Sequence, residues 1–208
     1  IGKTTFSFHL INYIFSLNEE FKYDLNKKEI NPINKSFSMM KKKIHPNFFN
    51  ISVKQDKKNI DILQIREMIN FINKSSFDNK FKIILIENIE YLNNFSANAL
   101  LKSIEEPNEK VIFILLYNNE HQCLDTIKSR CIEYKIKLDN KYIGKIVDYY
   151  FNKNIFENIS PEFKNYYCSP SIYINFIKFC LDYNLKYQNI SITEFINFYI
   201  NNSLYKKN

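Results

Sequence analysis

Residues 83–116 read IILIENIEYLNNFSANALLKSIEEPNEKVIFILL, and this stretch decides the fold class. Residues 83–86 and 111–116 are continuous apolar runs rich in β-branched side chains, which is typical of strands buried on both faces. The segment between them, residues 96–105, has helical character, and Pro107 ends that helix. A buried strand, a helix and a second buried strand in this order predict a parallel α/β sheet.

The same alternation of strands and helices extends in both directions along the chain. The apolar spacing predicts a helix over residues 4–16 and a strand over residues 48–53. A second helix is predicted over residues 62–72, with Asp61 as its N-cap. Residues 132–136 are expected to form one more short strand after the strand at 111–116.

The pattern changes after residue 138, because only helices are indicated from there to the end. The sequence therefore predicts an α/β domain over residues 1–138 and a small all-helical domain over residues 139–208. The predicted helices of the second domain cover residues 142–152, 161–166, 171–183 and 193–201.

The first residues match the end of a phosphate-binding loop, G-x-x-x-x-G-K-[ST], whose first half is missing from the sequence. Gly2 would turn the backbone N–H groups toward a phosphate, at the positive end of the following helix. Lys3 would reach the β- and γ-phosphates, and the Thr4 hydroxyl would hold Mg²⁺, with Thr5 next in the chain. A three-residue match also arises by chance, so nucleotide binding stays a separate question.

An active nucleotide hydrolase needs an acidic pair where a buried strand ends. Here the pair is Glu87-Asn88, and an amide cannot act as the general base that activates water. Glu87 either holds Mg²⁺ or is a strand-end carboxylate without a metal.

The composition sets wider limits on function. The chain has 208 residues, 45% of them hydrophobic, and a net charge of +7. The charge suits a nucleic-acid or acidic partner, although a Lys-rich composition accounts for it equally well. The four cysteines form no C-x-x-C pair, so zinc-finger spacing is absent, and no apolar run reaches the length of a membrane span. We expect a cytoplasmic protein without zinc.

Several segments together resemble one known family, the delta-prime subunits of the bacterial DNA polymerase III clamp loader, which belong to the clamp-loader branch of the AAA+ ATPases. The resemblance covers roughly residues 1–138. The segments that carry it are NALLK at 98–102, EEP at 105–107, TIKSRC at 126–131, HPNF at 45–48 and IRE at 65–67. Several motifs in the right order are far more specific than the incomplete phosphate loop.

The resemblance implies an AAA+ P-loop-type α/β domain followed by a helical lid, with a C-terminal collar domain expected beyond Asn208. It implies that Arg130 is an arginine finger, which acts in trans on the ATP of a neighbouring subunit. An ordinary surface charge or a salt-bridge partner is the alternative for Arg130. Three departures from the ATPase-active tau/gamma subunits favour the delta-prime type: the pair Glu87-Asn88, the absence of the zinc-binding cysteines within residues 17–44, and Ile172 in place of a sensor-2 arginine. The resemblance also implies that Asn118, after the strand at 111–116, is a polar residue that faces the γ-phosphate; a strand-end cap or turn residue is the alternative.

The implied partners are the tau/gamma ATPase subunits, the delta subunit, the sliding clamp and, through the assembly, primed DNA. ATP and Mg²⁺ are possible ligands of the degenerate site. An ATPase-active subunit of the tau/gamma type is the main alternative. A more distant alternative is a P-loop nucleotide kinase, which would need an Arg-rich lid, whereas the arginines here are Arg66 and Arg130.

Overall fold

The structure is a computed structural model that describes residues 2–54, 57–74, 81–118, 123–136, 138–166 and 168–204. The chain divides into two compact units, Gly2–Tyr134 and Lys135–Asn208. Each unit has its own hydrophobic core.

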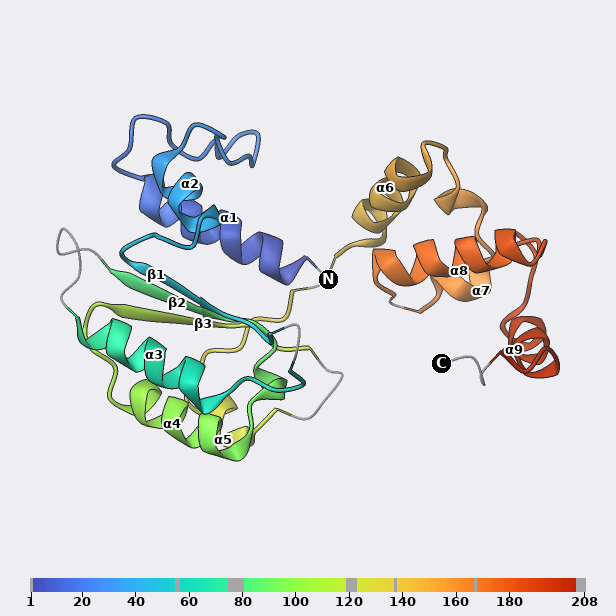
Figure 1. Cartoon of the computed structure of the whole chain (residues 1–208). Helices are drawn as coiled ribbons and strands as arrows, with labels where there is room; N and C mark the ends of the chain where they lie inside the picture. Colours follow the sequence, from blue (N-terminus) through green and yellow to red (C-terminus); the bar gives the residue numbers. More distant parts are fainter. Residues whose placement is uncertain are drawn as a thin grey trace. The chain divides into compact units, whose positions relative to one another are not determined.

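The first unit is built around a parallel sheet of three strands (Figure 1). The strands lie in the order β1 (Phe48–Ile51), β2 (Lys82–Ile86) and β3 (Val111–Leu115). Both neighbouring pairs are parallel, and Leu85 of β2 lies beside Asn50 on one side and beside Ile114 on the other. The predicted parallel α/β class is therefore confirmed.

Helices cover both faces of this sheet (Figure 1). One face carries α1 (Lys3–Ser16) and α2 (Lys35–Lys41). The opposite face carries α3 (Ile62–Asn73), α4 (Asn94–Glu105) and the short α5 (Asp125–Lys128), and a 3-10 turn, η2 (Ile89–Tyr91), follows β2.

The central strand β2 supplies side chains to both layers, because successive residues of a strand point to opposite faces. Ile83 and Leu85 join the core under α1 and α2. Ile84 and Ile86 join the core under α3 and α4. All four side chains are fully buried, which explains the unbroken apolar run that marks this strand in the sequence.

Lys82, the first residue of β2, is a charged residue inside the unit, with 3% of its surface exposed. Its ammonium donates hydrogen bonds to the backbone carbonyls of Phe71 at 2.6 Å and Ile72 at 3.2 Å, and also to that of Lys74. These are the carbonyls at the end of α3, which have no partner inside the helix. Burial, and to a smaller extent the charge of Lys74, lowers the pKa of Lys82.

Hydrogen bonds organise the long connection between α1 and α2. The Glu19 carboxylate accepts the Asn34 side-chain amide at 2.6 Å and the Ser36 backbone N–H at 3.2 Å, and it also accepts the Ser36 hydroxyl. Asn34 is fully buried and caps α2 by accepting the Phe37 N–H at 2.7 Å. Polar side chains thus hold the connection between α1 and α2 in place.

The His45 side chain packs and forms a hydrogen bond within the first unit. Its ring stacks on that of Phe15, with centroids 4.3 Å apart, and its Nδ1 accepts the Asn47 backbone N–H at 3.2 Å. Both contacts hold the turn that leads into β1.

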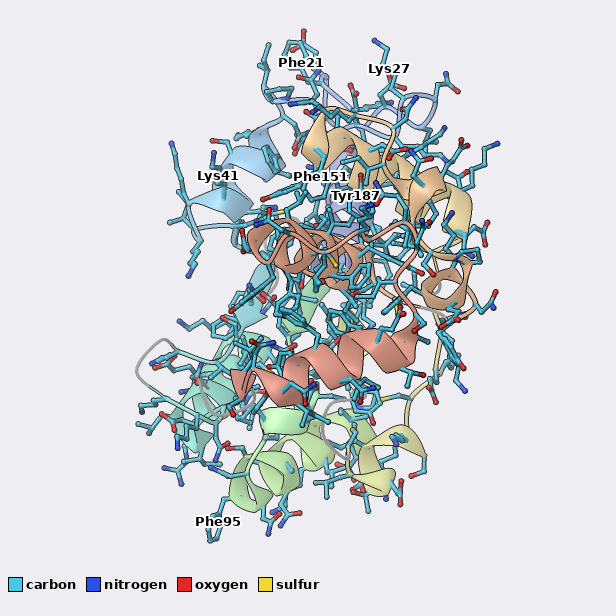
Figure 2. The ribbon with its side chains drawn as sticks, turned by 90° about the vertical axis from the view of Figure 1, so that its right-hand side faces the viewer. Phe21, Lys27, Lys41, Phe95, Phe151 and Tyr187 are labelled. Carbon is cyan, nitrogen blue, oxygen red and sulfur yellow. The ribbon has the colours of Figure 1, made fainter. Side chains whose placement is uncertain are left out.

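The second unit is all-helical. Its elements are α6 (Asn140–Phe151), η3 (Phe156–Asn158), α7 (Pro161–Lys164), α8 (Pro170–Asp182) and α9 (Ile192–Asn201). Gly144 lets α6 approach η3 closely, since a Cβ there would lie 2.7 Å from the Phe156 ring. Phe151 and Tyr187, both labelled in Figure 2, are partly buried against the core of this unit.

One predicted strand is wrong. Residues 132–136 have no strand structure, and Ile132 and Tyr134 are 82% and 81% exposed. A strand needs a neighbour that completes its hydrogen-bond ladder, and no described strand pairs with this segment.

Across the described residues, no helix combines the length and apolar character needed to span a membrane.

Candidate functional site

The first turn of α1 meets the carboxyl ends of β2 and β3. Gly2 precedes α1 in the left-handed region, with φ of +79°, which glycine adopts without strain. Lys3 and Thr4 follow in the first turn and are partly buried, whereas Thr5 is exposed. The N–H groups of a first helical turn have no partner inside the helix and suit an anion.

Lys3 contacts the end of β3. Its ammonium donates to the Asn118 side-chain carbonyl at 2.6 Å. The Asn118 amide nitrogen in turn donates to the Asn88 side-chain oxygen at 3.0 Å, and its backbone N–H reaches a Glu90 carboxylate oxygen at 3.3 Å. The predicted positions Lys3 and Asn118 are therefore brought together, and Asn118 links the ends of two strands.

Glu87 occupies the centre of the site, just beyond β2. One carboxylate oxygen accepts the Thr4 hydroxyl at 3.1 Å, and the other accepts the Asn50 side-chain amide at 2.9 Å. The Asn50 side-chain oxygen is buried and has no partner within the described parts of the chain. An oxygen in this state is available to a water molecule or to a ligand.

These residues fit a phosphate with Mg²⁺. Lys3 and the start of α1 offer positive charge and N–H donors, which a phosphate requires. The Thr4 hydroxyl and the Glu87 carboxylate are adjacent oxygen ligands, the type that Mg²⁺ prefers. A bound nucleotide would have to displace the present bond from Lys3 to Asn118.

The groups for hydrolysis fit less well. Asn88 has an amide at the position of the general base, and its backbone is left-handed, with φ of +56°. Ile172 lies in the first turn of α8, 54% exposed, and cannot contact a phosphate as an arginine would. The described residues contain no group of three or more His, Cys, Asp or Glu side chains placed to hold a metal ion.

Arg130 lies after α5, away from these residues in the sequence and in its contacts. Its guanidinium forms a salt bridge with Glu105 of α4 at 2.7 Å, and it donates to the Thr126 backbone carbonyl at 2.9 Å. A third donor contact reaches the Ser129 hydroxyl at 3.3 Å. The Arg130 side chain remains 38% exposed, so its fork of donors is oriented and still open to solvent.

Sequence reasoning missed three side chains of these sites. Asn50 carried a usable signal, because it is a polar residue inside the apolar strand β1. Glu90 and Glu105 carried no sequence signal that identifies a partner. Glu105 pairs with Arg130, 25 positions further along the chain.

The chain is therefore an α/β protein whose first helix begins at a G-K-T segment beside the polar ends of parallel strands. The chain belongs to the protein family described as "DNA polymerase III, delta subunit", whose profile matches residues 1–140. Membership fits the NALLK, EEP and TIKSRC segments, and the predicted resemblance to delta-prime-type clamp-loader subunits is confirmed.

Individual proteins similar to this chain include delta' and gamma subunits of DNA polymerase III. The DNA polymerase III subunit delta' of Pseudomonas aeruginosa is 35% identical over 89 residues, 43% of this chain and 27% of that relative. The subunit delta' of Buchnera aphidicola subsp. Baizongia pistaciae is 35% identical over 102 residues, 47% of this chain and 30% of the relative. The subunit gamma of the same organism is 37% identical over 100 residues, which are 48% of this chain and 26% of that relative. The chain thus spans less than a third of the length of these relatives.

Proposed function

We propose that this chain is a clamp-loader subunit that hydrolyses little ATP itself and supplies Arg130 to the ATP of a neighbouring ATPase subunit. The single observation that carries the proposal is the contrast between the two sites. The chain's own site has an amide, Asn88, where hydrolysis needs a base, whereas Arg130 keeps an oriented guanidinium that is partly open to solvent. A group that acts in trans does not require a working site in its own chain.

The contacts of Arg130 support such a role chemically. Exposed ion pairs such as Arg130–Glu105 contribute only about 0–1 kcal/mol. The guanidinium has five N–H donors, so a phosphate can accept charge-assisted hydrogen bonds from those that Glu105, Thr126 and Ser129 leave free. The charge that develops on a transferring phosphoryl group would then be stabilised by a preoriented cation.

The chain's own site would serve binding better than hydrolysis. Lys3 would hold phosphate oxygens, and Thr4 with Glu87 would hold Mg²⁺, which neutralises phosphate charge when it is bound. Asn88 can orient a water by hydrogen bonding but cannot remove its proton. ATP or ADP would therefore act at this site as a structural ligand.

The proposed partners are gamma- or tau-type ATPase subunits, the delta subunit and the sliding clamp, with primed DNA reached through the assembly. The proposed location is the cytoplasm.

An ATPase-active subunit of the tau/gamma type is the second candidate function. The Thr4–Glu87 contact of 3.1 Å and the similarity to the Buchnera gamma subunit favour it.

The decisive experiment measures DNA-stimulated ATP hydrolysis by a clamp loader reconstituted from this subunit and its cognate ATPase subunits. Arg130→Ala should lower the rate at least tenfold, about 1.4 kcal/mol of transition-state stabilisation. Arg130→Lys keeps the positive charge, but its hydrolysis rate should be little higher than that of Arg130→Ala, because the planar fork of donors is lost. Arg66→Ala, which changes an exposed arginine of α3, should leave the rate unchanged. Equal hydrolysis by intact Arg130→Ala assemblies would exclude the role in trans.

A further inference from the structure

Helix α6, the first helix of the second unit in Figure 1, has an apolar side toward the core and a second aromatic side toward solvent. Ile143 and Val147 fill the core side and are fully buried. We call the opposite side, formed by Tyr142, Lys145, Ile146 and Tyr149, the outer face of α6. These four positions follow the i, i+3, i+4, i+7 spacing of one helical stripe.

The outer face is exposed and is not needed to build the helical core. Tyr149 is 84% exposed, Tyr142 is 53% exposed and Ile146 is 44% exposed. A surface helix normally places polar residues on this side. Neighbouring exposed aromatic and aliphatic groups on a stable helix indicate an interaction surface.

The charge around the outer face is positive. Lys145 lies with its ammonium 6.0 Å from the centroid of the Tyr142 ring, and Lys178 of α8 lies 4.8 Å from the centroid of the flanking Tyr150 ring. The acid within α6, Asp148, is partly buried, and its carboxylate accepts the backbone N–H groups of the residues that start η3. Asp139 is the exposed N-cap three residues before Tyr142, so one negative charge lies at the N-terminal end of the face, where Lys145 and Lys178 outnumber it.

This combination favours a nucleic acid over a protein partner. Ammonium groups attract phosphates, and exposed tyrosine rings stack on bases of any sequence. Protein interfaces are enriched in tyrosine but depleted in lysine, whereas the outer face has Lys145 at its centre. A duplex keeps the faces of its bases stacked inside, so only a single strand offers them to Tyr142 and Tyr149.

The length of the face also suits a short single-stranded segment. Tyr142 and Tyr149 are seven residues apart, which is about 10 Å along a helix axis. That distance corresponds to roughly three nucleotides at about 3.4 Å each. We propose that the outer face of α6 binds single-stranded nucleic acid, with the two tyrosines stacking on bases and Lys145 contacting the phosphate between them. The proposal does not depend on the role of Arg130.

The test uses fluorescence anisotropy of a labelled oligo(dT) with the whole chain at several salt concentrations. The double variant Tyr142→Ala/Tyr149→Ala should weaken binding at least tenfold while duplex binding stays unchanged. Tyr166→Ala, which removes an exposed tyrosine elsewhere in the same unit, should bind as the wild type does. Lys145→Gln should reduce the dependence of log Kd on log salt by about 0.7, as expected when one phosphate contact on a single strand is lost; Lys186→Gln is its matched control.

Circular dichroism should show the same helical content for all variants. Unchanged oligo(dT) affinity of the double tyrosine variant would overturn the proposal. Equal weakening by Tyr142→Ala/Tyr149→Ala and by Tyr166→Ala would also overturn it, because the effect would not belong to the outer face. If the face variants instead impair only assembly with the ATPase subunits, the face is a protein interface and the nucleic-acid proposal is rejected.

Discussion

The Arg130 guanidinium lies 2.7 Å from the Glu105 carboxylate, so the segment after α5 is tied to the last turn of α4. Glu105 belongs to the EEP segment and Arg130 to the TIKSRC segment, two of the segments that carry the resemblance to clamp-loader subunits. The ion pair joins these two segments and gives the guanidinium a defined direction.

Removing the carboxylate should disturb this direction without unfolding the protein. Glu105→Gln should lower DNA-stimulated hydrolysis by the assembly about two- to fivefold, less than Arg130→Ala, because Arg130 keeps its contact with the Thr126 carbonyl. The free energy of unfolding should change by less than about 1 kcal/mol, since the pair is exposed. The matched control is Glu106→Gln, which should affect neither quantity. Identical rates for the two glutamine variants would contradict a positioning role for Glu105.

The chain's own nucleotide site gives a separate prediction. The isolated protein should hydrolyse ATP at background rate, and Lys3→Ala should not lower that rate, because Asn88 cannot activate water. Nucleotide binding, measured by calorimetry with ATP and Mg²⁺, should weaken in Lys3→Ala. Hydrolysis that is measurable in the wild type and abolished in Lys3→Ala would establish the tau/gamma-type alternative.

The sequence allowed some of these features to be predicted and not others, for physical reasons. The strands at 83–86 and 111–116 and the helix between them were predicted correctly from their continuous apolar runs. Full burial explains the run of β2. The expected burial of the second strand was wrong, because β3 lies at the edge of the described sheet and is only partly buried. The strand at 132–136 was predicted wrongly, because its alternating pattern cannot reveal whether a partner strand is present. Lys3, Glu87 and Asn118 were each assigned to one phosphate and Mg²⁺ site, from the G-K-T segment, the acidic strand end and the family resemblance, whereas the Arg130–Glu105 contact has no local pattern.

The connection between α1 and α2 should depend on Glu19. Glu19→Gln replaces one carboxylate oxygen, which is an acceptor, with an NH₂ group, which is a donor. That group would face the Asn34 side-chain amide and the Ser36 backbone N–H, which are also donors. The free energy of unfolding should fall by about 1–3 kcal/mol in urea titrations. The exposed neighbour offers the control Glu20→Gln, for which a change within about 0.5 kcal/mol is expected.

Cys180 should make the stability sensitive to alkaline pH. The thiol is fully buried, and burial raises its pKa from 9.0 to about 11. The folded chain therefore holds this proton more tightly than the unfolded chain, and stability is lost as the pH rises from about 9 to about 11. At about 1.4 kcal/mol per pH unit, the loss from this group approaches 2–3 kcal/mol.

The measurement compares urea unfolding at pH 9 and pH 11 for the wild type and for Cys180→Ala. The alanine variant should lose less stability between the two pH values, whatever its stability at pH 9. The exposed thiol of Cys131 provides the control, and Cys131→Ala should keep a slope closer to that of the wild type. An unchanged slope in Cys180→Ala would assign the alkaline transition to other groups.

Lys82 has a consequence for how the first unit opens. Because its ammonium holds the last carbonyls of α3, the end of that helix cannot fray while the first residue of β2 stays in place. We therefore expect the two segments to behave as one cooperative unit in native-state hydrogen exchange. Amide protons in the last turn of α3 and at the start of β2 should become accessible to solvent through the same opening event, with the same free energy.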